Sequence, residues 1–206
     1  MIFKKIKERC DALAANFIEI PQERKQILDK FTEVIRHKFV SNTPINLVYI
    51  CTHNSRRSHL GQVWAATAAS YYNIKNVSTF SGGTEATAFN GNAIKALETS
   101  GFLIEKKDDS SNPRYDVFFA DDQSTTCFSK RYDGSDNPSD NFVAVMTCSD
   151  ADENCPYIPG CDARIGTTYN DPKAYDHTTL VDEKYLERSN QIAIECLYVF
   201  SNIRTS

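Results

Sequence analysis

Hydrophobic residues recur at helical spacing over the first 40 residues and again near the end of the chain. In residues 1–40, apolar positions three and four apart predict helices. Pro21 divides this region in two, because proline is favoured in the first turn of a helix. Residues 181–203 carry an apolar stripe of the same period. Helices are therefore expected at both ends.

Short runs of β-branched, aromatic and aliphatic residues predict strands between these ends. They are residues 45–50, 77–80 and 142–146. The last run is apolar throughout, as is typical of a buried central strand. Helices are expected at residues 58–72 and 92–99, and Gly101 would end the second. This alternation of strands and helices predicts a parallel sheet with right-handed crossovers.

Two regions depart from the alternation. Residues 115–120 and 125–130 flank a polar segment and predict a β-hairpin. Residues 148–176 are dense in Pro, Gly, Asp and Asn, which predicts irregular structure. A chain of 206 residues can form one domain, so residues 1–42 are expected as a helical extension packed on a core domain of residues 43–206.

Composition and charge narrow the possible functions. Hydrophobic residues make up 41% and charged residues 24%, the balance of a soluble globular protein. The net charge of -4 argues against nucleic-acid binding, so an anionic substrate would need local positive charge. No apolar run reaches the roughly 18 to 20 residues of a membrane span, and the N-terminus is too charged for a signal peptide. A cytoplasmic protein without membrane or nucleic-acid partners is expected.

Cysteine usage points to chemistry and not to a disulfide framework. The seven cysteines are Cys10, Cys51, Cys127, Cys148, Cys155, Cys161 and Cys196. Without a secretion signal, structural disulfides are not expected, and the default role of a free cysteine is that of a small buried hydrophobe. The cysteines in polar, loop-like segments are therefore the candidates for function.

The segment Cys51–Ser58 follows the first predicted strand directly. The strand would deliver Cys51 to the carboxyl edge of the sheet, where backbone N–H groups and the next helix N-terminus favour an anion. Arg57 could fork onto the anion's oxygens, Ser58 could steady the Cys51 thiolate and Asn54 could brace the loop. The alternative is a buried strand-end cysteine beside a solvated arginine. We predict that Cys51 attacks a tetrahedral oxyanion. The predicted oxyanion-binding residues are Thr52, His53, Asn54, Ser55, Arg56, Arg57 and Ser58.

This loop resembles the signature loop of the low-molecular-weight tyrosine phosphatases and of the thioredoxin-coupled arsenate reductases built on the same fold. Their loops usually carry glycine before the asparagine and often a second cysteine before the arginine; here those positions are His53 and Arg56. Histidine tolerates a positive φ less readily than glycine, so the sequence leaves the backbone geometry at His53 open.

Cys148 and Cys155 form a second cluster, with six residues between them in an acidic, polar stretch. Such a pair suits an exposed and mobile redox couple: Cys148 can attack an adduct on Cys51, and Cys155 can then attack Cys148. The sequence Cys-Ser-Asp-Ala-Asp and the spacing resemble the redox segment of the arsenate reductases. The alternatives are inert buried thiols, or a zinc site of Cys148, Cys155 and Cys161. The role of Cys161 is open.

Asp171 is the strongest candidate for a general acid, since the loss of an oxygen leaving group needs a proton. Asp171-Pro172 resembles the acid loop of the same family, and Asp176 is the weaker alternative. Tyr169 and Tyr175 flank this loop and could wall a ring-binding cleft, although tyrosines beside turns are more often ordinary packing.

Pattern and resemblance together predict an α/β fold: a three-layer doubly wound sheet, mainly parallel, with about four core strands and helices on both faces. The N-terminal helical extension and the inserted hairpin would be additions to it. The leading prediction for function is arsenate reduction, with no cofactor and no metal, and with thioredoxin or a similar dithiol as reductant. The alternatives are phosphomonoester hydrolysis through a phosphocysteine, and a non-catalytic oxyanion-binding or redox-sensing module.

Overall fold

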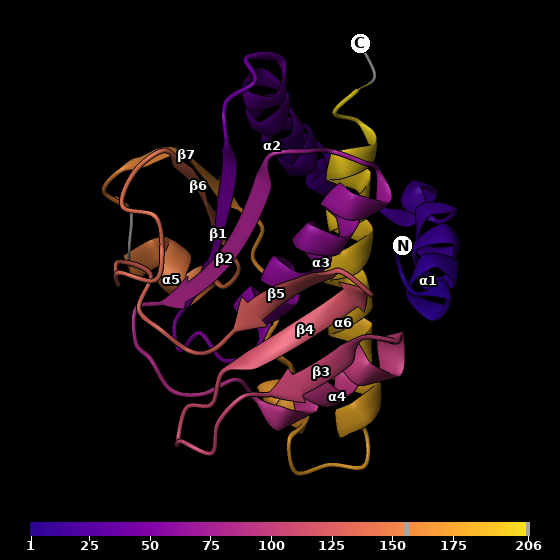
Figure 1. Cartoon of the computed structure of the whole chain (residues 1–206), viewed down its shortest axis with the longest axis vertical. Helices are drawn as coiled ribbons and strands as arrows, with labels where there is room; N and C mark the ends of the chain where they lie inside the picture. The colour runs from indigo at the N-terminus through magenta and orange to yellow at the C-terminus, as the bar shows by residue number, and fades with distance from the viewer. Residues whose placement is uncertain (155–156, 205–206) are drawn as a thin grey trace.

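A four-stranded parallel sheet lies at the centre of the computed structural model, which describes residues 1–154 and 157–204 (Figure 1). The strand order is β2-β1-β6-β7. The strands are β1 (Ile45–Cys51), β2 (Val77–Gly83), β6 (Phe142–Met146) and β7 (Cys161–Gly166). All three pairings are parallel, which requires crossover connections and not hairpins. The predicted α/β class and the mainly parallel sheet of about four core strands are confirmed.

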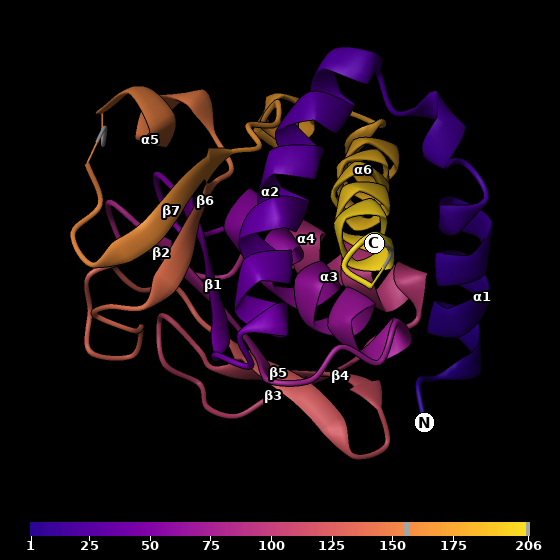
Figure 2. The same cartoon turned by 90° about the horizontal axis from the view of Figure 1, so that it is seen from above.

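Helices cover both faces of this sheet (Figure 2). The helices are α1 (Lys4–Ala14), α2 (Gln22–Val40), α3 (Arg57–Tyr71), α4 (Gly91–Ser100), α5 (Ser149–Asn154) and α6 (Val181–Ser201), with the short 3-10 helices η1 (Phe17–Glu19) and η2 (Pro172–Tyr175). Successive side chains of a strand point to opposite faces. Leu47 and Tyr49 of β1 accordingly join the core cluster that contains α2, α3 and α6, while Val48 and Ile50 pack with residues of α5. Burial on both faces explains the continuous apolar run of β1.

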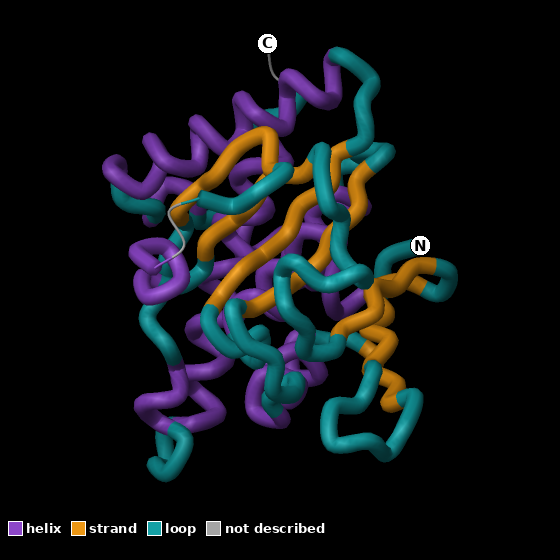
Figure 3. The backbone as a smooth tube through the Cα atoms, turned by 90° about the vertical axis from the view of Figure 1, so that its left-hand side faces the viewer, coloured by secondary structure: helices purple, strands orange, loops and turns teal. Residues whose placement is uncertain are grey.

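A second, antiparallel sheet stands apart from the first. It contains β3 (Leu103–Lys106), β4 (Tyr115–Ala120) and β5 (Gln123–Cys127) in the order β3-β4-β5. The predicted hairpin is confirmed as β4 and β5. The third strand, β3, was not predicted, because its four residues are mostly exposed and show no run of buried positions. Ile2 forms an isolated bridge with Ala120, so the start of the chain lies beside this sheet (Figure 3).

The prediction of irregular structure for residues 148–176 is wrong in part. This segment contains α5 and β7, and β7 pairs in parallel with β6, with one irregularity at Asp162. The sequence of β7, Cys-Asp-Ala-Arg-Ile-Gly, has little intrinsic strand character. Its structure comes from the hydrogen bonds that β6 offers, a tertiary effect that local patterns do not report.

The N-terminal region packs on the rest of the chain through α6. Ile6 and Cys10 of α1 and Leu28, Phe31 and Ile35 of α2 are buried in the main core cluster together with α6. Pro21 precedes α2 directly, and Gly101, with φ of 110°, ends α4 as predicted. Among the described residues, no helix combines the length and the apolar character needed to cross a membrane.

Candidate active site

Cys51 is the last residue of the central strand β1, at the carboxyl edge of the sheet. It lies level with Gly83 at the end of β2, and Thr147, which follows β6, donates its backbone N–H to Ile50 O at 2.7 Å. The Cys51 side chain is buried, and its Sγ lies 3.1 Å from Ser58 Oγ. The thiol therefore faces the start of α3, as the sequence predicts for a nucleophile in an anion-binding loop.

Asn54 supplies the left-handed turn of the loop Cys51–Ser58, hereafter the signature loop. Its φ is 43° and it is fully buried. Asn54 Nδ2 donates to Ser58 Oγ at 2.9 Å, and Asn54 Oδ1 accepts from the backbone N–H of Lys130 at 2.8 Å. His53 does not have a positive φ. The histidine in place of glycine is therefore accommodated without strain at this position.

Arg57 is the first residue of α3 and is 9% exposed. Its Nη1 donates to Tyr169 O at 2.7 Å and its Nη2 to Asp171 Oδ2 at 2.8 Å. Its Nε is a buried donor without an acceptor among the described residues. A buried N–H group of this kind costs free energy unless it is hydrogen-bonded, so it suits an oxyanion oxygen in the signature loop.

Arg56 lies nearer to Asp176 than to Asp171, whose Oδ1 is 4.0 Å from Arg56 Nε. Its Nε donates to Tyr185 OH at 2.8 Å, and its Nη2 lies 3.3 Å from Asp176 Oδ2. The Tyr185 hydroxyl donates to Asp176 Oδ1 at 2.5 Å. Burial and this carboxylate raise the pKa of Tyr185 to about 12, so the phenol stays neutral. Arg56 thus fastens the signature loop to α6 and to Asp176, and its contact with an oxyanion remains a prediction.

Asp171 lies across from the signature loop at the start of η2. Its Oδ1 accepts from the backbone N–H of Lys173 at 3.0 Å, its Oδ2 is paired with Arg57, and its side chain is 32% exposed. The structure therefore brings Cys51, Arg57 and Asp171 to one edge of the sheet. Tyr169 is buried, and its hydroxyl donates to Glu195 Oε2 at 2.7 Å, which makes it part of the packing and not a cleft wall.

Cys148 lies next to the signature loop, just after β6. Its Sγ is 3.5 Å from Thr52 Oγ1 and accepts from the backbone N–H of Ala151 at 3.4 Å. Cys148 is 1% exposed, so the expectation of an exposed thiol is wrong for this residue. The cause is its place at the start of α5, where it faces the loop and the core. Cys155, its predicted partner, lies outside the described residues.

Cys161 is far from this edge. It is the first residue of β7 and pairs with Phe142, whereas Met146 and Gly166 mark the other end of the two strands. Five strand residues span about 15 Å. Within residues 1–154 and 157–204, no group of three or more His, Cys, Asp or Glu side chains could hold a metal ion.

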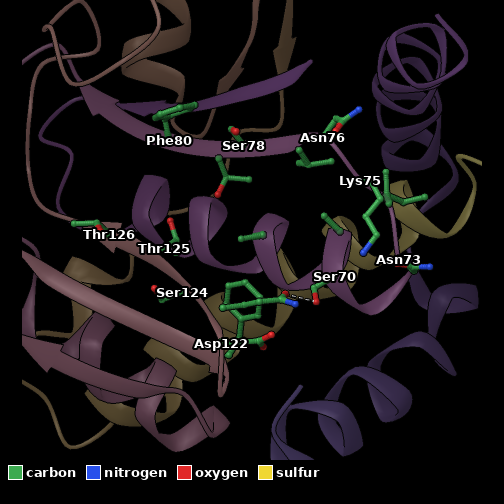
Figure 4. A pocket seen from close by; sticks show the side chains of 17 residues that line it. Ser70, Asn73, Lys75, Asn76, Ser78, Phe80, Asp122, Ser124, Thr125 and Thr126 are labelled. Carbon is green, nitrogen blue, oxygen red and sulfur yellow. Dashed lines mark hydrogen bonds between the residues drawn. The ribbon is translucent and has the colours of Figure 1, made fainter. Parts of the chain in front are cut away.

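Two cavities differ in their relation to the signature loop. One of about 350 Å³ opens beside it and is lined by His53, Arg56, Phe89 and Lys173, among others. A larger one, of about 780 Å³, lies between α3, β2 and β5 (Figure 4). Hydroxyl and amide side chains line much of the larger cavity, and no predicted site residue does. Of these two cavities, only the smaller one is lined by residues of the signature loop.

Three residues that contact the site or the segment before Asp171 were not predicted: Tyr185, which binds Arg56 and Asp176, Glu195, which accepts from Tyr169, and Arg24, which ion-pairs with Glu195 at 2.8 Å. All three act through contacts between segments far apart in the sequence. One signal was present, because Glu195 interrupts the apolar stripe of residues 181–203, and a carboxylate there needs a buried partner.

The chain is similar in sequence to known arsenate reductases. No protein-family model matches the chain. It is 30% identical over 118 residues to an arsenate reductase of Staphylococcus aureus (strain Newman), covering 57% of this chain and 70% of the relative. It is 28% identical over 126 residues to an arsenate reductase of Bacillus subtilis (strain 168), covering 61% and 73%.

Solved structures share the fold. An arsenate reductase in the phosphate binding state superposes with a TM-score of 0.50 at 16% identity, covering 77% of this chain and 98% of that one. An arsenate reductase from Archaeoglobus fulgidus DSM 4304 has a TM-score of 0.50 at 14% identity, covering 75% and 98%. These neighbours agree with the parallel sheet and its flanking helices.

Proposed function

Since the chain belongs to the family of arsenate reductases that share the low-molecular-weight tyrosine phosphatase fold, and is therefore an enzyme, we propose that it reduces arsenate with Cys51, Cys148 and Cys155. The observation that carries the proposal is Cys148, buried with its Sγ 3.5 Å from Thr52 Oγ1. Hydrolysis through a phosphocysteine needs the signature loop, but no step of that reaction uses a second thiol.

The first step is attack of the Cys51 thiolate on arsenic. An S–As bond forms and one As–O bond breaks, and Asp171 donates the proton with which the oxygen leaves as water. Two sets of donors would hold the remaining oxygens: Nε of Arg57 and the backbone N–H groups of the signature loop. The buried Nε without an acceptor among the described residues supports this role.

In the second step the Cys148 thiolate attacks Cys51 Sγ. A disulfide forms between the two cysteines, the S–As bond breaks, and its electron pair stays on arsenic, which leaves as arsenite. Arsenic is thereby reduced by two electrons and two thiols are oxidised to one disulfide. The shared burial of Cys51 and Cys148 in one cluster supports direct transfer between them.

In the third step Cys155 attacks Cys148, which frees Cys51 and leaves a Cys148–Cys155 disulfide for an external dithiol, such as a thioredoxin-like protein. Helix α5 fills all six positions between these cysteines. A helix advances about 1.5 Å per residue, so a six-residue helical spacer spans about 9 Å. A disulfide needs Cα atoms within about 7 Å. We therefore expect α5 to unwind at least in part when this disulfide closes.

Phosphomonoester hydrolysis through a phosphocysteine is the second candidate. It is favoured by the cavity of about 350 Å³ beside the signature loop, which has room for a substituent larger than an oxyanion. This reaction would use Cys51, Arg57 and Asp171 but neither Cys148 nor Cys155. The two candidates therefore differ in their dependence on the cysteine pair.

The test is arsenate reduction with thioredoxin and hydrolysis of p-nitrophenyl phosphate, measured for the native chain and four variants. Cys51→Ser is expected to lose both activities. Cys148→Ser should lose reduction altogether, because no thiol then displaces arsenite from Cys51, whereas Cys155→Ser should lose only multiple-turnover reduction. Both variants should keep any hydrolysis of p-nitrophenyl phosphate. Cys161→Ser is the matched control and should retain reduction, because the length of β6 separates it from Cys51. Multiple-turnover reduction that survives the loss of Cys155 would refute the relay.

A second pair of variants tests the acid. Asp171→Asn is expected to lower kcat by about 10² to 10⁴, the usual contribution of a positioned proton donor. Asp176→Asn removes a carboxylate of the same loop that faces Arg56 and Tyr185 instead, and should lower kcat less. The reverse order of effects would assign the acid to Asp176.

A further inference from the structure

An ion pair outside the reaction centre joins α2 to α6. Arg24 of α2 donates from Nε to Glu195 Oε1 at 2.9 Å and from Nη2 to Glu195 Oε2 at 2.8 Å. The Glu195 side chain is 4% exposed and that of Arg24 is 16% exposed. A buried, bidentate ion pair of this kind fixes the relative position of the two side chains. Loss of either partner would leave the other charge buried without compensation.

The same ion pair also contacts residues 167–169, the segment that leads to Asp171. Glu195 Oε2 also accepts from the Tyr169 hydroxyl at 2.7 Å, and the Arg24 guanidinium lies 4.8 Å from the centre of the Tyr169 ring. Arg24 Nη2 donates in addition to Thr167 O at 2.9 Å. Residues 167 and 169 are thus held from the side of α2 and α6.

This segment carries both acceptors of Arg57. Arg57 Nη1 donates to the backbone oxygen of Tyr169, and Arg57 Nη2 donates to the carboxylate of Asp171, two residues further along. A displacement of Tyr169 would move both acceptors together. The position of the Arg57 guanidinium in the signature loop therefore depends on where Tyr169 is held.

We infer that Arg24 and Glu195 are positioning residues, which through Tyr169 hold Arg57 in its oxyanion-binding position; this inference rests on the proposed function of Arg57. It gives the N-terminal region a role in the site, since Arg24 lies within residues 1–42. The alternative is that the ion pair only attaches α2 to α6.

Arg24→Met, compared with Arg36→Met, separates these two roles. Arg36 lies on α2 twelve residues after Arg24, about 18 Å along the helix. Its Nη2 donates to Asn202 O at 2.6 Å, just beyond the end of α6. We measure the Kd of the reduced chain for inorganic phosphate by calorimetry, the kcat and KM of arsenate reduction, and the Tm. Arg24→Met is expected to raise Kd and lower kcat at least tenfold, since small misplacements of catalytic groups cost that much. Arg36→Met should lower Tm but change Kd and kcat less than about twofold.

The double variant Arg24→Met with Glu195→Met distinguishes stability from positioning. It removes the buried carboxylate together with its partner, so Tm should recover relative to Arg24→Met. Phosphate binding should stay weak, because the Tyr169 hydroxyl has lost its carboxylate. Recovery of Kd together with Tm would overturn the inference, as would equal effects of Arg24→Met and Arg36→Met.

If Arg24→Met does not fold, Tyr169→Phe removes only the hydroxyl contact with Glu195, and unchanged phosphate affinity in that variant overturns the inference. If the native chain reduces no arsenate but binds phosphate, the proposed function fails while the Kd comparison still decides the role of Arg24. A native chain that binds no phosphate at all overturns both.

Discussion

At the scale of single residues, the hydrogen bonds around Ser58 orient its hydroxyl toward the nucleophile. The backbone N–H of Lys130 needs an acceptor, so it fixes Asn54 with Oδ1 toward it and Nδ2 toward Ser58 Oγ. Because Ser58 Oγ accepts from Asn54, its own hydrogen is available to Cys51 Sγ at 3.1 Å. Ser58 is thus a donor to the thiolate.

Ser58→Ala should therefore slow alkylation of Cys51 by iodoacetamide at neutral pH by about tenfold, the effect of one hydrogen bond to a charged group. The measurement uses a background in which Cys148, Cys155 and Cys161 are serine. The other three cysteines are inert, since burial raises the pKa of Cys10, Cys127 and Cys196 to about 12. As a matched control, Ser100→Ala removes another buried helical hydroxyl. An unchanged alkylation rate in Ser58→Ala would exclude the donor role.

His59 makes stability depend on pH. It is fully buried on α3 with its ring stacked on Phe89, 4.2 Å between centroids. Burial, and to a smaller extent the charge of Lys130, lower the pKa of His59 from 6.5 to about 3. Between these values the unfolded chain binds a proton that the folded chain does not, so stability is full above pH 6.5 and falls as the pH drops toward 3.

His59→Phe keeps the stacked ring and removes this titration. Relative to the native chain, its free energy of unfolding should gain about 3 kcal/mol between pH 7 and pH 4.5, at about 1.4 kcal/mol for each pH unit below 6.5. Urea denaturation at the two pH values measures the difference. The exposed His177, changed to Gln, should show no such gain, and parallel curves for His59→Phe and the native chain would contradict the assignment.

At the scale of elements, the end of β2 packs closely against the backbone of the signature loop at Gly83. A Cβ on Gly83 would lie 2.6 Å from Thr52 O and 2.7 Å from Asn54 N, closer than side-chain carbons approach backbone atoms. Gly83→Ala should therefore displace the signature loop, weaken phosphate binding at least tenfold and lower Tm. Gly91 at the start of α4 has nothing within 4 Å of its Cβ position, so Gly91→Ala should leave both properties unchanged or raise Tm. Native phosphate affinity in Gly83→Ala would show that the loop adapts.

The elements that the sequence predicts are those whose burial leaves a pattern. β1 and β6 are buried on both faces and read as apolar runs, and the edge rule then predicts that Cys51 and the loop after it lie at the carboxyl edge of the sheet. Asp171 was predicted only from the resemblance of Asp171-Pro172 to the acid loop of the family. β7 and α5 leave no such pattern, because contacts with other segments hold them in place. β7 is paired with β6, and Arg164 of β7 forms an ion pair with Asp152 of α5 at 2.6 Å. Contacts such as Arg24 with Glu195, 171 residues apart, follow only from the folded chain.

At the scale of the whole molecule, the N-terminal region belongs to the main core. Ile6 and Cys10 of α1 and Leu28 and Ile35 of α2 are at most 1% exposed, and they pack in one cluster with α6. Burying an apolar side chain of this size contributes about 1.5 to 3 kcal/mol. Several such residues contribute as much as the net stability of a domain, about 5 to 15 kcal/mol.

Residues 43–206 alone should therefore fail to fold cooperatively. The truncated chain would expose the face of α6 that α1 and α2 cover, and it would leave Glu195 buried against Tyr169 without Arg24. Thermal melting followed by circular dichroism should show no sharp transition, and calorimetry should detect no phosphate binding. Adding residues 1–42 as a separate peptide should restore both, because the contacts that α1 and α2 make are noncovalent. A truncated chain that melts sharply and binds phosphate with native affinity would make the extension dispensable and would also remove Arg24 from the site.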